Sequence, residues 1–150
     1  MRTISVFLLV AAVLAALALA PAATARGDAG SAGRSTLTAR DSRFGRILFD
    51  GRGFVLYAFT RDPRGRSACS GACAAAWPPY LASRPLAGRG VARGRLGTTR
   101  RADGRLQVTY AGRPLYYYVG DRSPGQILCQ NVEEFGGLWL VVRPDGRPVR

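Results

Sequence analysis

Histidine and lysine are absent from the 150-residue sequence, and the only methionine is Met1. Histidine is the commonest general base and the commonest metal ligand of proteins, so its absence excludes Ser/His/Asp and Cys/His triads within this chain. No other group of residues matches a catalytic motif. The sequence therefore predicts a protein that is not an enzyme, with no catalytic residue, no metal site and no cofactor.

Acidic residues are scarce as well. There are 9 Asp and Glu residues against 22 arginines, and the net charge is +13. One interpretation is an arginine-driven polyanion binder, because the planar guanidinium group suits phosphate and carboxylate. The other is the composition of a GC-rich genome, which the high content of Ala, Gly and Arg favours. The arginines are spread along the chain and form no basic helix face, so composition is preferred and polyanion binding is kept as an alternative.

The N-terminal segment predicts export. Arg2 precedes an uncharged apolar run from Val6 to Ala20, and Ala23-Thr24-Ala25 fits the small-x-small rule for signal-peptide cleavage. We expect residues 1–25 to be removed after Ala25, which leaves a secreted or envelope-located chain with no integral membrane span. No cysteine lies near the cleavage site, so no lipid anchor is expected there. Residues 26–42 contain almost no large apolar side chain and predict a flexible lead-in.

The remainder of the chain contains one stretch twice. Residues 47–62 and residues 106–121 each hold an apolar run, a glycine turn and a second apolar run that ends in Tyr-x-aromatic-x-x-Asp. Alternate side chains of a strand share a face, and both faces of the second run in residues 47–62 are apolar, which predicts a buried strand. One hairpin alone is marginal in water, whereas two can bury a shared face. The predicted fold is mostly β: a compact antiparallel domain over residues 43–150, made of two pseudo-symmetric hairpin-based repeats at about 43–80 and 96–143.

The repeated motif also carries a resemblance. It occurs as Tyr57/Phe59/Asp62 and Tyr116/Tyr118/Asp121, and the segment Cys69-x-Gly71-x-Cys73-Ala74 precedes Trp77-Pro78-Pro79. Together with Gly112-x-Pro114-Leu115-Tyr116 and Gly136-Gly137-x-Trp139, this pattern resembles the bacterial secreted-repeat lipoproteins with a Tyr-x4-Asp motif. The resemblance implies an exported or surface-attached protein of tandem repeats, without an assigned biochemical function. This chain differs from the lipoprotein members in lacking a lipobox cysteine.

Two interpretations of the motif stand side by side. In each copy the tyrosine and the aromatic residue two positions later share a strand face, and the aspartate begins a turn. The preferred interpretation is structural, with the carboxylate accepting hydrogen bonds from backbone N–H groups or from the tyrosine hydroxyl. The alternative is a ligand site in which Asp62 and Asp121 converge, and the sequence alone leaves this open.

The three cysteines are Cys69, Cys73 and Cys129. Disulfides are the default in an exported protein, and three cysteines leave one thiol over. Chain entropy favours a long bridge to Cys129. Such a bridge is expected to stabilise the fold by on the order of 4 kcal/mol, against about 2 kcal/mol for the short loop between Cys69 and Cys73. Proximity and the resembled family favour Cys69–Cys73, which is the prediction, with Cys129 free or intermolecular. The alternative is thiol chemistry, as a redox couple or a soft Cu(I) site with copper as the cofactor.

Some aromatic residues are predicted to lie in the core and one is predicted to be exposed on the surface. Trp77 and Trp139 are predicted to be structural, although aromatic rings on a sheet can also stack carbohydrate or bases. Tyr117 lies on the strand face opposite to Tyr116 and Tyr118. It is predicted to be exposed in a small cationic-aromatic patch with Arg113 and Arg122.

These observations favour a non-catalytic binding or structural module at the cell envelope. Its partners are undefined, with envelope polyanions or glycans as candidates. A thiol-dependent redox or Cu(I)-handling protein is one alternative, and an arginine-driven polyanion binder is another.

Overall fold

A computed structural model of the protein describes residues 34–150. The predicted signal peptide, its cleavage site at Ala25 and the first part of the lead-in lie outside these residues. Within the described part, no helix has the length and apolar character needed to cross a membrane.

The fold is mostly β and consists of three small sheets, each of three strands. The first sheet has the order β2-β1-β4, the second β3-β9-β8 and the third β5-β6-β7. Their bounds are β1 Arg34–Ser42, β2 Gly45–Asp50, β3 Tyr57–Phe59, β4 Arg84–Ala87, β5 Leu96–Arg100, β6 Leu106–Tyr110, β7 Arg113–Pro114, β8 Val132–Glu134 and β9 Gly137–Val141. The described helices are short: α1 spans Ala72–Ala76 and the 3-10 turn η1 spans Arg93–Arg95.

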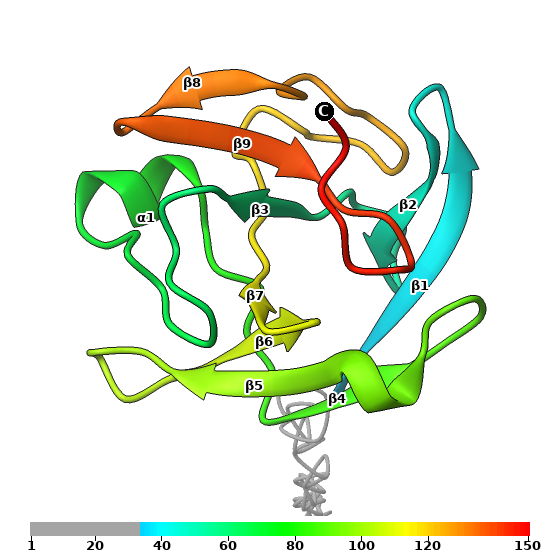
Figure 1. The fold of residues 1–150 in the computed structure, drawn as a ribbon, viewed down its shortest axis with the longest axis horizontal. Helices are drawn as coiled ribbons and strands as arrows, with labels where there is room; N and C mark the ends of the chain where they lie inside the picture. The colour runs from blue at the N-terminus through cyan, green and yellow to red at the C-terminus, as the bar shows by residue number, and fades with distance from the viewer. Residues whose placement is uncertain (1–33) are drawn as a thin grey trace, which may run out of the picture.

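The sheets surround the centre of the molecule. In Figure 1, β8 and β9 lie above, β5 lies below and β1 lies to the right, with β3 and β7 between them. Backbone hydrogen bonds also link strands to segments outside their own sheets. Leu48 N of β2 donates to Val142 O, directly after β9, at 2.9 Å, and Val108 N of β6 donates to Tyr80 O at 2.8 Å.

The prediction of a mostly β domain with antiparallel hairpins is confirmed, with one addition. β1 pairs with β2 in antiparallel fashion, but it pairs with β4 in parallel. A parallel pair requires a long connection, and here residues 43–83 supply it, including β2, β3 and α1.

The flexible lead-in predicted for residues 26–42 is wrong for residues 34–42, which form β1. Leu37 and Ala39 of this strand are buried at 0% and 4% exposure. The composition of the segment does not indicate a core strand, because only two apolar side chains of this strand face the core. The strand gains its order from neighbours on both edges, β2 and β4, which a local reading of composition does not detect.

The buried side chains form two clusters. One contains both tryptophans, all three cysteines and the two motif tyrosines at 57 and 116. The other is largely aliphatic and includes Leu37, Leu48, Leu56 and Leu115 together with Tyr80 and Tyr110. The motif residues of the two repeats therefore share a single cluster.

Candidate functional site

The two motif tyrosines meet at the centre of the domain. Tyr57 N donates to Tyr116 O at 2.9 Å, and Tyr116 N donates to Tyr57 O at 2.9 Å. This reciprocal pair is an isolated antiparallel bridge between the repeats, and both residues are fully buried. The same residue of each repeat thus pairs with its counterpart, as expected for two units related by an approximate two-fold axis.

The side chains of the motif cross from one repeat to the other. The Tyr57 hydroxyl donates to Asp121 Oδ2 at 2.7 Å, and the Tyr116 hydroxyl donates to Asp62 Oδ2 at 2.7 Å. Each carboxylate also accepts a backbone N–H from the segment that follows it, Ala68 for Asp62 at 2.7 Å and Leu128 for Asp121 at 3.0 Å. We call these two tyrosine–aspartate pairs the motif clasp. The two carboxylates of the clasp are bound to different tyrosines.

The aromatic rings also pack across the boundary between the two repeats. Phe59 of the first repeat stacks on Trp139 of the second at 4.2 Å between centroids, and Trp77 stacks on Trp139 at 4.0 Å. Tyr118 of the second repeat lies against Trp77 at 4.7 Å. Four rings therefore form a continuous stack in the order Phe59, Trp139, Trp77, Tyr118. Each tryptophan is packed by the motif aromatic of the other repeat.

Burial sets the electrostatics of the clasp. It raises the pKa of Asp62 to about 6, although the Ala68 N–H, the Tyr116 hydroxyl and the nearby Arg101 all act to lower it. Burial likewise raises the pKa of Asp121, against the hydrogen bond from Tyr57. The pKa values of Tyr57 and Tyr116 are raised, again mainly by burial. Both hydroxyls therefore remain protonated at neutral pH and act as donors to the carboxylates.

A buried arginine supports one side of the clasp. Arg101 Nη1 donates to Gln107 Oε1 at 2.6 Å and to Ser67 Oγ at 2.9 Å, and Nη2 donates to Cys69 O at 2.7 Å. Ser67 Oγ in turn lies 2.7 Å from the Tyr116 hydroxyl. Sequence reasoning missed this residue because Arg100 and Arg101 are adjacent in the sequence, and only the fold turns one of them inward.

The cysteines pair as Cys69–Cys73, as predicted, and Cys129 is a free, buried thiol. Ala68 and Leu128 bind the motif aspartates, so Cys69 and Cys129 occupy corresponding positions in the two repeats. Burial raises the pKa of the Cys129 thiol, while the Tyr118 hydroxyl acts in the opposite direction. Within residues 34–150, no three His, Cys, Asp or Glu side chains lie together as a metal site would require.

Tyr117 is half-buried, and the patch predicted around it takes a different form. Its hydroxyl donates to Asp50 Oδ2 at 3.0 Å, and its ring packs edge-on against Tyr80. The guanidinium group over the ring belongs to Arg52, at 5.9 Å from the centroid. The Tyr117 side chain therefore lies toward the second core cluster. The sequence pattern predicted that it would be exposed to solvent.

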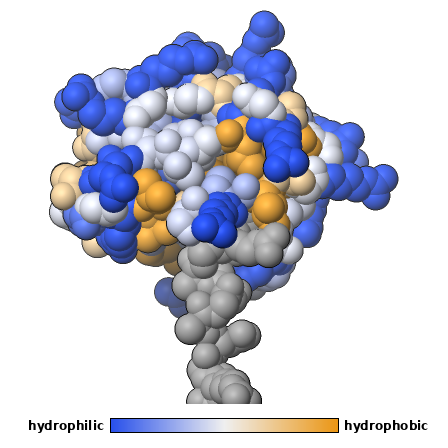
Figure 2. Space-filling view, turned by 90° about the horizontal axis from the view of Figure 1, so that it is seen from below, coloured by the Kyte–Doolittle hydropathy of each residue, from blue (hydrophilic) through white to orange (hydrophobic). Residues whose placement is uncertain are grey.

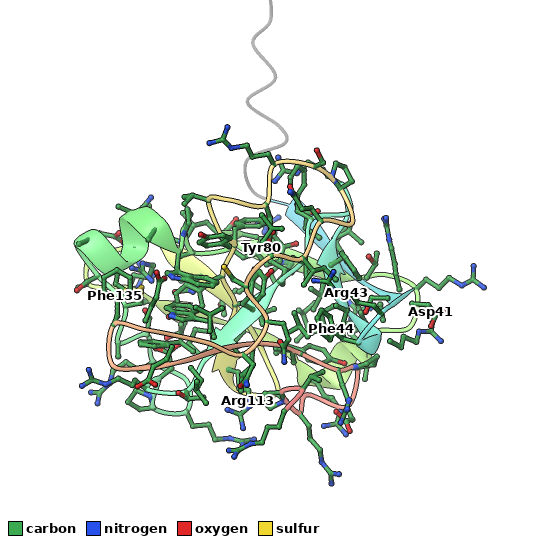
Figure 3. All side chains as sticks on the ribbon, turned by 90° about the horizontal axis from the view of Figure 1, so that it is seen from above. Asp41, Arg43, Phe44, Tyr80, Arg113 and Phe135 are labelled. Atoms are coloured by element: carbon green, nitrogen blue, oxygen red, sulfur yellow. A yellow bond between two sulfur atoms is a disulfide. The ribbon has the colours of Figure 1, made fainter. Side chains whose placement is uncertain are left out.

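Arg113 lies at a cavity of about 480 Å³ instead. Figure 3 shows it at the rim of the molecule, away from Tyr80. The cavity walls carry four arginines and few other polar groups, and the lining residues are Thr60, Arg113, Leu140, Arg143, Arg147, Pro148 and Arg150. We call this the arginine cavity.

Comparison with known proteins places the chain in a family. The family described as a secreted repeat of unknown function matches residues 38–80 and 97–143, which is more than half of the chain in two copies. The protein belongs to this family of secreted repeat proteins, and the resemblance inferred from the motifs is confirmed. No curated protein and no solved structure matches the chain.

Proposed function

We propose that this chain is an exported, non-catalytic binding module of the cell envelope that holds anionic envelope polymers in its arginine cavity and needs no cofactor. The family supports export and a repeat architecture. The composition of one cavity supports the ligand class, because four positively charged side chains surround it without a matching set of acids.

Other side chains compensate little of the positive charge of the arginine side chains in this cavity. Among the described residues, the side chains of Arg113, Arg143 and Arg150 have neither an ion-pair partner nor a hydrogen-bond acceptor. The fourth arginine, Arg147, has only the distant Asp145 at 3.9 Å. Guanidinium groups that the protein leaves unpaired are available for phosphate, sulfate or carboxylate groups of a ligand.

Two larger depressions in the surface also carry arginines and are weaker candidates. One, of about 520 Å³, is lined by Arg40, Arg46 and Arg89, with Asp41 beside them. The other, a groove of about 840 Å³, contains Arg66, Arg100, Arg101 and Arg105. There, Arg105 is bound to Asp103 at 2.6 Å, and Arg101 is committed to internal acceptors. Figure 2 shows hydrophilic residues spread over one face of the domain between apolar ones. The arginine cavity is preferred because its walls carry four arginines and no aspartate or glutamate, whereas each of the two larger depressions has an aspartate in its walls.

The aromatic and thiol alternatives have less support. Trp77 and Trp139 are fully buried in the ring stack and offer no face on which a sugar could lie. Cys69 and Cys73 are joined, and all three cysteines are at most 8% exposed, so a reductant or Cu(I) has little access to sulfur. The tyrosine–aspartate pairs serve as structural contacts between repeats.

Removing three arginines of the cavity is expected to weaken polyanion binding. The variant Arg113→Gln/Arg143→Gln/Arg147→Gln should bind heparin and dextran sulfate roughly tenfold more weakly, and the slope of log K against log salt should fall by about 2 to 3. Elution from heparin-agarose and equilibrium titration over a salt series measure both quantities. The circular dichroism spectrum and melting temperature should not change, because these side chains are not part of the core.

The control is a variant of equal charge, Arg84→Gln/Arg93→Gln/Arg122→Gln, whose arginines lie outside the cavity. It should retain most of the affinity of the unmodified chain. Equal losses in the two triple variants would show that binding follows net charge alone, and would refute the arginine cavity as the site.

A further inference from the structure

The arginine cavity continues toward one end of the motif clasp. Arg113 also lines a second, smaller cavity of about 120 Å³, together with Phe59, Asp62, Arg64 and Gly112. The neighbouring residue Thr60 belongs to the arginine cavity, so the two spaces adjoin along residues 59–60 and at Arg113. Asp62 lines the smaller cavity only, and the described walls of the two cavities contain no other aspartate or glutamate.

Several groups face the Asp62 carboxylate. The Tyr116 hydroxyl and the Ala68 N–H donate to it, and Arg101 acts on it from the segment between β5 and β6. On the cavity side are Arg64, from the segment after β3, and Arg113 of β7. Among the described residues, neither of these two arginines forms an ion pair with Asp62, so both remain available to a ligand.

Glycine at position 112 makes room for Arg64. Its φ is +74°, and a Cβ at this position would lie 2.9 Å from Arg64 Cγ and 3.1 Å from its Nε. The Arg64 side chain therefore lies directly across the turn that leads to Arg113. Arg64 and Arg113 therefore both line the small cavity, as Asp62 does.

We propose that Asp62 is a specificity-determining residue of the anion site, whose negative charge opposes the anionic ligand and whose protonation strengthens binding in acid. This inference rests on the proposed function, because it concerns the ligand of the same arginine cavity. The ionised carboxylate repels sulfate or phosphate groups that bind beside it. The neutral carboxyl group does not.

The direction of the pH effect follows from the position of the carboxyl group. Because burial raises the pKa of Asp62 to about 6, the group changes charge between pH 7.5 and pH 5. An anionic ligand favours the protonated form, so the affinity should rise as the pH falls through this range. The chain has no histidine, which removes the side chain that ordinarily titrates there.

The test is the affinity for dextran sulfate at pH 5.0, 6.0, 6.7 and 7.5, at constant ionic strength, by fluorescence or calorimetric titration. Sulfate esters keep their charge across this range, whereas phosphate monoesters titrate near pH 6 and would obscure the effect. Neutral dextran serves as the blank. We expect the affinity of the unmodified protein to rise roughly three- to tenfold from pH 7.5 to pH 5.0.

Two matched variants isolate the carboxyl group. Asp62→Asn should bind at pH 7.5 with about the strength that the unmodified chain reaches at pH 5.0, and its affinity should vary little with pH. Asp121→Asn removes the corresponding carboxylate of the other repeat, which lines neither cavity, and should keep the full pH dependence. If Asp62→Asn does not fold, Tyr116→Phe offers a second route. Loss of its hydrogen bond should move the midpoint of the pH dependence to higher pH.

The outcomes are distinguishable. Binding that depends on the cavity arginines but changes equally with pH in the unmodified protein and in Asp62→Asn would overturn this inference and leave the proposed function intact. Loss of the pH dependence in Asp121→Asn would also overturn this inference. So would a Tyr116→Phe variant whose pH dependence has the same midpoint as that of the unmodified protein. Absence of binding to dextran sulfate at every pH would refute the proposed function itself.

Discussion

Replacement of Trp139 with alanine is expected to destabilise the domain by about 3–5 kcal/mol, enough to unfold a substantial fraction of many small proteins. Trp139 is fully buried and is the second ring of the four-ring stack, with Phe59 on one face and Trp77 on the other. Its loss would remove the ring that lies between Phe59 and Trp77, interrupt the stack and open a large cavity between the repeats. Urea unfolding followed by far-UV circular dichroism measures the change in the free energy of unfolding.

The matched control is Phe135→Ala, which removes an aromatic ring that is 43% exposed and lies close to Trp139 in the sequence. It should change the free energy of unfolding by about 0.5 kcal/mol or less. Similar losses in both variants would contradict the role of the stack as the main packing between repeats.

A second large effect is expected at Arg101. Substitution with methionine keeps much of the volume of the side chain but leaves Gln107 Oε1 without its donor, and Cys69 O and Ser67 Oγ with one donor fewer each. Buried polar groups without partners are costly, and we expect a loss of about 2–4 kcal/mol. The measurement is again equilibrium unfolding by urea at neutral pH.

Arg100→Met is the control for this prediction, because it changes the adjacent residue, which is exposed and donates only to Gly104 O. Its effect should be small, about 0.5 kcal/mol or less. If Arg100→Met and Arg101→Met destabilise the domain equally, the inward orientation of Arg101 is wrong.

The sequence predicts the repeated unit and the residue types of its motif, but it does not predict which residues of the two repeats contact each other. The repeated Tyr-x-aromatic-x-x-Asp pattern is a local signal, and it leads directly to the hairpin-based halves and to a structural role for the aspartates. Which tyrosine hydroxyl each aspartate binds depends on contacts between segments that are far apart in the sequence. Tyr57 and Asp121 are 64 residues apart, and no local periodicity distinguishes this pairing from one within a repeat.

Other differences have related causes. β1 is ordered by β2 and β4 on its two edges, which composition does not reveal. Tyr117 follows the alternation of a strand in the sequence, but the described backbone there makes bridges at Tyr116 only, and the Tyr117 hydroxyl turns to Asp50. In both cases the deciding contacts come from distant parts of the chain.

The clasp and the proposed arginine cavity relate differently to the segments that the family matches. The clasp lies within the segments matched by the family, as do Arg113 and Arg143, whereas Arg147 and Arg150 lie beyond them. The proposed site therefore combines two positions of the repeat scaffold with two from the segment that follows. Asp62 belongs to the clasp and also lines the small cavity beside the arginine cavity, so it connects the scaffold to the proposed site.

The exchange of side chains between repeats is tested most directly by double-mutant cycles. Unfolding free energies are measured for Tyr57→Phe, Asp121→Asn, Asp62→Asn and the two double variants that combine Tyr57→Phe with each aspartate change. The structure predicts a coupling energy of about 1 kcal/mol or more between Tyr57 and Asp121, and additivity within about 0.5 kcal/mol between Tyr57 and Asp62. Coupling of Tyr57 to Asp62 in place of Asp121 would show that the motif closes within each repeat, and would contradict the clasp.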